Sequence, residues 1–271
     1  MSVQVTYTNK NIAKSLVNYA FFTLDKFKID HLKKILTKVE MSYALDILKK
    51  SNLKKNLLHF NLSSKKSLIL ISVKESLKNS EAENLGAEFY DFIKINSLNN
   101  ILLKSESLKI KNDKEFLGHF IHGLKLKSYE FNIYKSQKEK KFFSINIDIK
   151  KKNLITQNEV KFKAIELGTN FARDLVSEPP NVLNPKTYVQ EIKKLSKLGL
   201  KIKAYNEKEL KKLGLNALLG VGLGSANETY LVTLEWNGKK GSKQKPLAFV
   251  GKGVCFDTGG ISLKPARFME E

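Results

Sequence analysis

The first 150 residues alternate between short apolar runs and stretches whose apolar residues recur at helical spacing. Residues 3–7 alternate between apolar and polar, and residues 67–73 (SLILISV) form a short apolar run, so both predict strands. Residues 81–95 and 114–126 carry apolar residues every three or four positions and predict two helices. Further strands are expected at residues 100–103, 129–134 and 142–149. Strands that alternate with helices predict an α/β domain over residues 1–150.

The second half of the chain opens with a longer helical pattern. It covers residues 160–176 and should end before Pro179 and Pro180, because prolines disfavour continuation of a helix. Asn184 followed by Pro185 is typical of the start of another helix. Strands are expected at residues 200–205, 231–236 and 247–250, with a short helix at 207–213. We therefore predict an N-terminal domain over residues 1–150, an interdomain helix and linker over 151–180, and a second α/β domain over 181–271.

Composition adds that the chain is globular and strongly basic. Of its 271 residues, 42% are hydrophobic and 28% are charged, which is ordinary for a globular protein. The formal net charge of +21 would suit a nucleic-acid-binding protein. However, Arg173 and Arg267 are the only arginines among 48 basic residues, and arginine is the residue best suited to bidentate contacts with phosphates and bases. We therefore favour solvent-facing lysines as the explanation and keep nucleic-acid binding as the alternative.

The sequence shows no membrane segment and no disulfide framework. No apolar run approaches the roughly 18 residues that suggest a membrane span. The apolar residues 15–24 lack a signal-peptide cleavage site. Cys255 is the single cysteine, which excludes Cys-rich zinc modules, and we interpret it as a structural thiol in an apolar strand. We expect a cytoplasmic protein.

Two further patterns carry no chemistry in our interpretation. His119 and His122 are three residues apart on a predicted helix, and without evident carboxylate neighbours we interpret them as helix-surface residues that bind no metal. The glycines of residues 220–225 (GVGLGS) resemble the start of a dinucleotide-binding loop. That motif, however, needs a glycine where Ser225 stands, and a strand rather than a helix follows. We expect a turn-rich loop there.

A glycine-rich stretch around Asp257 is the best candidate for chemistry. The expected strand at residues 247–250 leads into Lys252, Asp257, Gly259-Gly260 and Lys264. An aspartate with little side-chain bulk beside it can present both oxygens to divalent cations. A neutral lysine amine can also ligate a metal, because a nearby dication lowers the pKa of that lysine. A second lysine could stabilise a developing oxyanion. The alternative is a glycine-rich turn with solvated lysines.

Three blocks of sequence resemble the M17 leucyl aminopeptidase family, also called cytosol aminopeptidases. Residues 250–265 (VGKGVCFDTGGISLKP) resemble the active-site signature of that family. Residues 172–185 (ARDLVSEPPNVLNP) resemble its interdomain helix, and residues 218–238 (LLGVGLGSANETYLVTLEWNG) resemble a third block. The blocks occur in the family's order. The resemblance implies a macro-like N-terminal α/β domain followed by an α/β metallopeptidase catalytic domain.

The same resemblance implies an activity and a role for three residues. Family members are hydrolases that release N-terminal residues such as Leu from peptides, using two divalent cations, Mn²⁺ or Zn²⁺, and in some cases bicarbonate. By the motif match, Lys252 would bind one metal and Asp257 would bridge both. Lys264 would be the catalytic residue that polarises the scissile carbonyl. The family typically assembles as homohexamers, and no membrane is involved.

The resemblance also implies metal ligands that this sequence does not contain. Family members use four carboxylates and one lysine, and the further carboxylates follow the segment that ends here at Glu271. We therefore expect a truncated catalytic domain and a chain that is inactive alone. Whether residue 271 ends a fragment or a truncated gene product stays open. The alternative functions are a basic nucleic-acid-binding module and a decayed, non-catalytic module.

Overall fold

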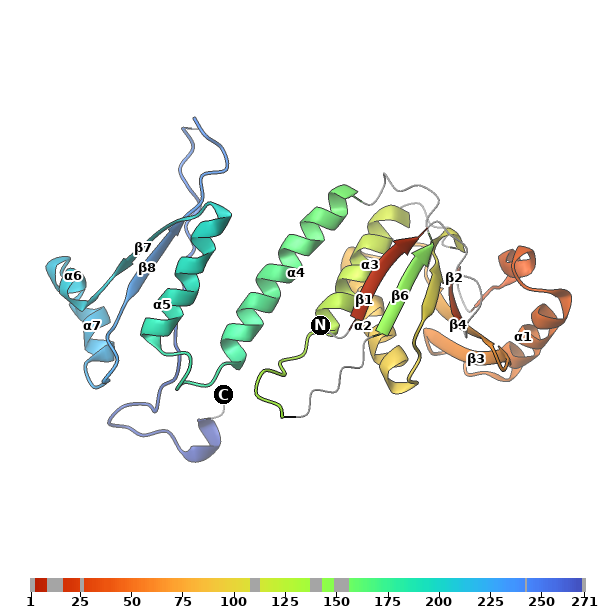
Figure 1. The fold of residues 1–271 in the computed structure, drawn as a ribbon, viewed down its shortest axis with the longest axis horizontal. Coiled ribbons are helices and arrows are strands. Elements are labelled where there is room, and N and C mark those ends of the chain that lie inside the picture. Colours follow the sequence, from red (N-terminus) through yellow and green to blue (C-terminus); the bar gives the residue numbers. More distant parts are fainter. Residues whose placement is uncertain are drawn as a thin grey trace. The chain divides into compact units, whose positions relative to one another are not determined.

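The computed structural model describes residues 3–8, 17–24, 27–107, 113–136, 143–148, 156–241 and 243–269. The chain forms two compact units, Met1–Ala172 and Arg173–Glu271 (Figure 1). Each unit combines helices and strands, which confirms the predicted α/β class. No helix in the described part of the chain has the length and apolar character that a membrane span requires.

The first unit is built on a six-stranded sheet with the order β1-β6-β5-β2-β4-β3. All neighbouring strands pair in parallel except β3 and β4, which form an antiparallel hairpin. Strands β2, β4 and β5 at its centre are mainly apolar, as expected for a parallel sheet that is covered on both faces. The strands are β1 (Val3–Thr8), β2 (Val17–Leu24), β3 (Leu57–Ser63), β4 (Lys66–Val73), β5 (Ile101–Lys104) and β6 (Phe143–Asp148).

Helices cover both faces of this sheet (Figure 1). On one face, α1 (Lys38–Lys50) packs with the short helix η1 (Asp30–Lys34) over a core that includes Phe21 and Leu70. On the other face, α2 (Asn79–Ile95) and α3 (Asp113–Lys127) share a core with the opposite side chains of the same strands. The predicted apolar face of α3 is buried, as the sequence indicated. Its members are Phe116, Leu117, Phe120, Ile121 and Leu124.

Helices α2 and α3 cross closely because glycine stands at their contact. A Cβ atom added at Gly86 would collide with the backbone carbonyl of Phe120. A Cβ atom added at Gly123 would collide with the carbonyl of Glu83. Neither helix could move away without opening the core beneath it, so a side chain at either position would destabilise the unit.

Two carboxylate contacts, one of them buried, correct our interpretation of the histidines on α3. Oε1 of Glu166, on α4 (Thr156–Ser177), lies 3.2 Å from Nδ1 of His122, and its Oε2 accepts a hydrogen bond from Lys125 Nζ at 3.3 Å. His119 Nδ1 lies 2.6 Å from Glu83 Oε1. The His122 and Glu166 side chains are each 5% exposed. These histidines are therefore hydrogen-bonding partners of carboxylates rather than surface residues.

The second unit contains a two-stranded antiparallel sheet and short helices. Asn184 and Asn206 cap the starts of α5 and α6 through their side chains, as the Asn184-Pro185 pair predicted for the first of them. Gly199 ends the first helical segment in the left-handed conformation, with φ of 88°. The elements are α5 (Pro185–Lys194), η4 (Leu195–Leu198), β7 (Lys201–Tyr205), α6 (Glu207–Lys212), α7 (Asn216–Gly222), β8 (Leu231–Glu235) and η5 (Ala266–Phe268).

Three local predictions were wrong. Residues 129–134 and 247–250 are not strands, because neither stretch has a neighbouring strand among the described residues. The first stretch is instead held by an ion pair between Lys94 and Glu130. The GVGLGS stretch is also not simply a turn-rich loop, since α7 continues through Gly222.

Candidate functional site

The candidate site is the loop around Asp257, in the second unit. Residues 249–259 have no regular secondary structure, and the backbone then turns sharply at Gly259 and Gly260, with φ of +89° and +76°. The N–H of Lys264 donates to the carbonyl of Thr258 over 2.8 Å and closes this turn. A Cβ atom at Gly259 would lie 2.5 Å from the carbonyl oxygen of Ser262, so the close approach requires glycine.

Both oxygens of Asp257 are held within this turn. Oδ1 accepts a hydrogen bond from the Gly259 N–H at 2.8 Å, and Oδ2 accepts one from Lys264 Nζ at 3.2 Å. The Lys264 hydrogen bond is the largest of the effects that lower the pKa of Asp257. The Gly259 hydrogen bond follows, and the charges of Lys264 and Lys252 add to it. The carboxylate is therefore ionised at neutral pH, and half of its surface remains exposed.

Lys252 acts on the same carboxylate electrostatically: its positive charge helps to lower the pKa of Asp257. The side chain is exposed. The adjoining backbone lies close to α5, because a Cβ atom at Gly253 would come within 3.0 Å of the Tyr188 ring. The structure thus brings Lys264 into contact with Asp257, and brings Lys252 near enough for its charge to act on that carboxylate.

The donor set can be compared with what a divalent cation needs. Such ions normally take four or more ligands. Asp257 offers carboxylate oxygens of the required kind, and Lys252 offers an amine that would have to be neutral. No group of three or more His, Cys, Asp or Glu side chains comes together among the described residues. The two residues therefore fit a metal site as part of a larger ligand set.

Cys255 lies in the same stretch but has the properties of a structural thiol. The residue is half-buried, and burial raises the pKa of its thiol. A raised pKa keeps the sulfur protonated and unreactive. The stretch around it is not a strand, so the expected strand setting of this cysteine was wrong.

Sequence comparison decides which proteins this loop relates to. The profile described as "Cytosol aminopeptidase family, catalytic domain" matches residues 170–271, which include Lys252, Asp257 and Lys264. Residues 170–271 are thus similar to the catalytic domain of the cytosol aminopeptidase family. The resemblance inferred from the three sequence blocks is thereby confirmed.

Curated cytosol aminopeptidases match more of the chain than this profile does. The chain is 42% identical over 182 residues to a "Probable cytosol aminopeptidase" of Phytoplasma australiense, a match that covers 66% of this chain and 37% of that relative. It is 47% identical over 155 residues to the corresponding protein of Brucella suis biovar 1, over 55% of this chain and 31% of that relative. The chain thus matches about a third of the length of these relatives.

Solved structures show the same fold over nearly all of the chain. A mutant of tomato leucine aminopeptidase superposes with a TM-score of 0.75 at 19% identity, covering 95% of this chain and 55% of that one. The bottromycin maturation enzyme BotP in complex with Mn gives a TM-score of 0.66 at 19% identity, covering 94% of this chain and 51% of that one. At this level of identity the likeness establishes the fold alone.

Proposed function

We propose that the chain is part of a metal-dependent aminopeptidase that releases N-terminal residues such as Leu from peptides. The observation that carries the proposal is the cluster of Lys252, Asp257 and Lys264 on one glycine-shaped loop within residues 170–271, the part of the chain that matches the cytosol aminopeptidase profile. The Mn complex of BotP is a structural relative that supports metal dependence for this fold.

Lys252 and Asp257 are the residues that would hold the metal ions, as Mn²⁺ or Zn²⁺. When bound, divalent cations supply Lewis acidity and lower the pKa of water. Asp257 is suited to the role because it is ionised and half exposed, and because the Gly259 N–H fixes its orientation. A third ligand of either metal would come from residues beyond this pair, and bicarbonate is a further candidate in the complete site.

Lys264 is the catalytic residue in this proposal. Its ammonium group is aimed by the turn that the Thr258 carbonyl closes, and it lies 3.2 Å from Asp257. A fixed positive charge at that place stabilises the negative charge that develops on the scissile carbonyl oxygen. The lysine stem packs against the turn, since a Cβ atom at Gly259 would approach its Cγ to 3.1 Å.

The proposal extends to assembly and to the isolated chain. We expect the full-length gene product to act on peptides in the cytoplasm and to form homohexamers, as the family resemblance implies. The 271-residue polypeptide should be inactive alone, because two protein ligands cannot hold two divalent cations firmly.

The test is hydrolysis of Leu-p-nitroanilide by the full-length gene product in the presence of Mn²⁺. We expect activity that a chelator removes, and loss of that activity in Asp257→Ala. The exposed lysine Lys245 provides a matched surface control as Lys245→Ala, which should retain activity. A full-length product that is inert with all three loop residues intact would overturn the proposal, and turnover by the 271-residue polypeptide would contradict the ligand argument.

A further inference from the structure

The sheet of the first unit has a point at which its chain connections leave in opposite directions. After β2 the chain passes through α1 on one face and returns on the side of β4. After β5 it passes through α3 on the other face and returns on the opposite side, at β6. Strands β2 and β5 are neighbours, so the reversal falls between them. In open α/β sheets, ligands bind at such a point, outside the carboxyl ends of the strands.

A crevice opens at this place because the two strands differ in length. Pairing between β2 and β5 ends at Phe21 and Lys104, whereas β2 continues to Leu24. The backbone N–H of Phe22, just past the last pair, donates instead to the Ser107 hydroxyl at 2.8 Å. That hydroxyl in turn donates to the carbonyl of Lys104 at 2.6 Å. Ser107 therefore ties the two strand ends together and forms a fixed wall.

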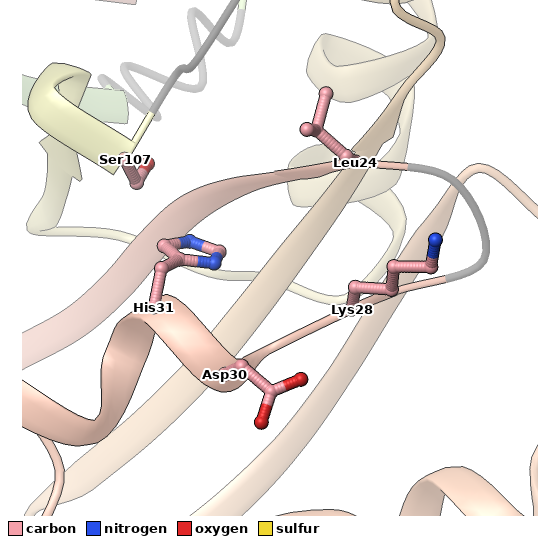
Figure 2. A pocket seen from close by; sticks show the side chains of 5 residues that line it. All are labelled: Leu24, Lys28, Asp30, His31 and Ser107. Atoms are coloured by element: carbon pink, nitrogen blue, oxygen red, sulfur yellow. The ribbon is translucent and has the colours of Figure 1, made fainter.

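The crevice is a cavity of about 430 Å³. Its volume lies within the range of roughly 300–1,000 Å³ that is usual for small-molecule sites. Among the described residues, it is lined by the last residue of β2, by three residues that follow β2 and by one that follows β5: Leu24, Lys28, Asp30, His31 and Ser107. Figure 2 shows the Lys28 amine near the end of β2 and the His31 ring farther back, on the side of Ser107, with the Asp30 carboxylate pointing away from both.

The segment that presents Lys28 is held in place from both sides. Phe27 and Ile29 are both buried, at 2% exposure each, so the lysine between them must point outward. The Lys28 N–H also donates to the Leu24 carbonyl over 3.2 Å. Phe27 has a φ of 61°, a left-handed conformation that bulky side chains rarely adopt. The lysine is thus positioned by buried neighbours rather than by a flexible turn.

The charges around the cavity favour an anion. Among the described lining residues, Asp30 is the one acidic side chain, and Lys33 Nζ already lies 2.9 Å from its Oδ1. The Lys33 hydrogen bond lowers the pKa of Asp30, so the two form a neutral pair at the rim. Lys28 then adds a positive charge to the described lining. We propose that this cavity binds a phosphate-bearing small molecule of about nucleotide size, with the phosphate at Lys28.

The proposal is tested by calorimetric titration of the 271-residue polypeptide with AMP, inorganic phosphate and adenosine at physiological salt. We expect saturable binding of AMP, weaker binding of phosphate and no binding of adenosine, because the anion supplies the recognition. Lys28→Gln should weaken AMP binding about tenfold, as expected for loss of one charge-assisted contact. Asp30→Asn should strengthen it, since the rim then loses its negative charge.

Lys55→Gln is the matched control, because Lys55 is exposed in the same unit, carries the same charge and is not among the residues that line the cavity. It should leave AMP binding unchanged. If Lys55→Gln and Lys28→Gln weakened AMP binding equally, the general positive charge of the chain would explain the binding, and the proposal would be overturned. Adenosine binding as tight as AMP binding, or no AMP binding at millimolar concentration, would also overturn it.

Discussion

Lys264 Nζ and Asp257 Oδ2 lie 3.2 Å apart, so the proposed catalytic lysine contacts the proposed metal ligand. A cation that binds this oxygen must compete with the lysine for it. We therefore predict that Lys264→Gln in the full-length product lowers turnover of Leu-p-nitroanilide by about a hundredfold or more, as removal of an oxyanion-stabilising group does. The same variant should bind Mn²⁺ at least as tightly as the wild type. Metal affinity by calorimetry and kcat together separate the two effects.

Asp257→Asn serves as the comparison for that experiment. It keeps the shape of the side chain but removes the charge, so it should lose Mn²⁺ affinity and turnover together. If Lys264→Gln lost Mn²⁺ affinity to the same extent as Asp257→Asn, the assignment of the lysine to the carbonyl rather than to the metal would be wrong.

Two adjacent glycines allow a second, closely matched test of the loop. Gly259 and Gly260 both have positive φ, but only at Gly259 would a Cβ atom meet another group, the Ser262 carbonyl. Both alanine variants carry the left-handed penalty of roughly 1–2 kcal/mol. Gly259→Ala should in addition disturb the N–H that holds Asp257, and should therefore reduce Mn²⁺-dependent activity by about tenfold or more relative to Gly260→Ala. Equal activity of the two variants would show that the turn does not position Asp257.

The apolar pattern of the sequence predicted the helices and strands that pack in the interior. It failed where a strand depends on pairing with another strand. Residues 67–73 lie in β4, where the consecutive residues Ser67–Ile71 are all buried, and α3 forms because its apolar stripe meets the sheet. Residues 129–134 alternate between apolar and polar and also predict a strand. Ile133 and Tyr134 are nevertheless both more than half exposed, and no strand lies beside them among the described residues. A strand needs a partner, and its own sequence does not specify one.

The candidate loop could be identified from sequence because its chemistry is local, whereas other polar contacts are not. Lys252, Asp257 and Lys264 lie within 13 positions, and the glycines that shape their turn are visible among them. His122 and Glu166 are 44 positions apart and meet only because α4 packs on α3. The cavity at the end of β2 has no sequence signal either, since the left-handed residue there is Phe27 rather than a glycine.

The contact of Glu166 with His122 and Lys125 should contribute strongly to the stability of the first unit. Both the His122 and Glu166 side chains are almost fully buried, and removing one partner of a buried pair leaves the other uncompensated. We predict that Glu166→Ala lowers the free energy of unfolding by about 3 kcal/mol, measured by urea unfolding and far-ultraviolet circular dichroism. Glu83→Ala removes the carboxylate that contacts His119. The Glu83 side chain is 34% exposed, so this change should lower the free energy of unfolding by about 1 kcal/mol or less. Equal losses would mean that burial does not set the strength of these pairs.

The pair between Glu40 and Lys66 should make stability depend on pH. Burial by itself would raise the pKa of Glu40, but hydrogen bonds from Lys66 Nζ at 2.7 Å and from the Thr37 N–H at 2.9 Å outweigh it and lower the pKa. A carboxylate whose pKa is lower in the folded protein stabilises that state above its ordinary value of 4.5, and the contribution is lost as the pH falls through the folded-state pKa.

Glu40→Gln should therefore reduce the free energy of unfolding by about 1 kcal/mol near neutral pH and by almost nothing at strongly acidic pH, where the wild-type carboxyl is protonated. Urea unfolding of both proteins across this range measures the difference. Asp46→Asn is the control, since Asp46 and Lys49 form an exposed pair on the same helix and their contact should contribute little at any pH. If the loss of unfolding free energy in Glu40→Gln stayed constant into acidic pH, it would come from the shape of the α1 cap rather than from the charge of Glu40.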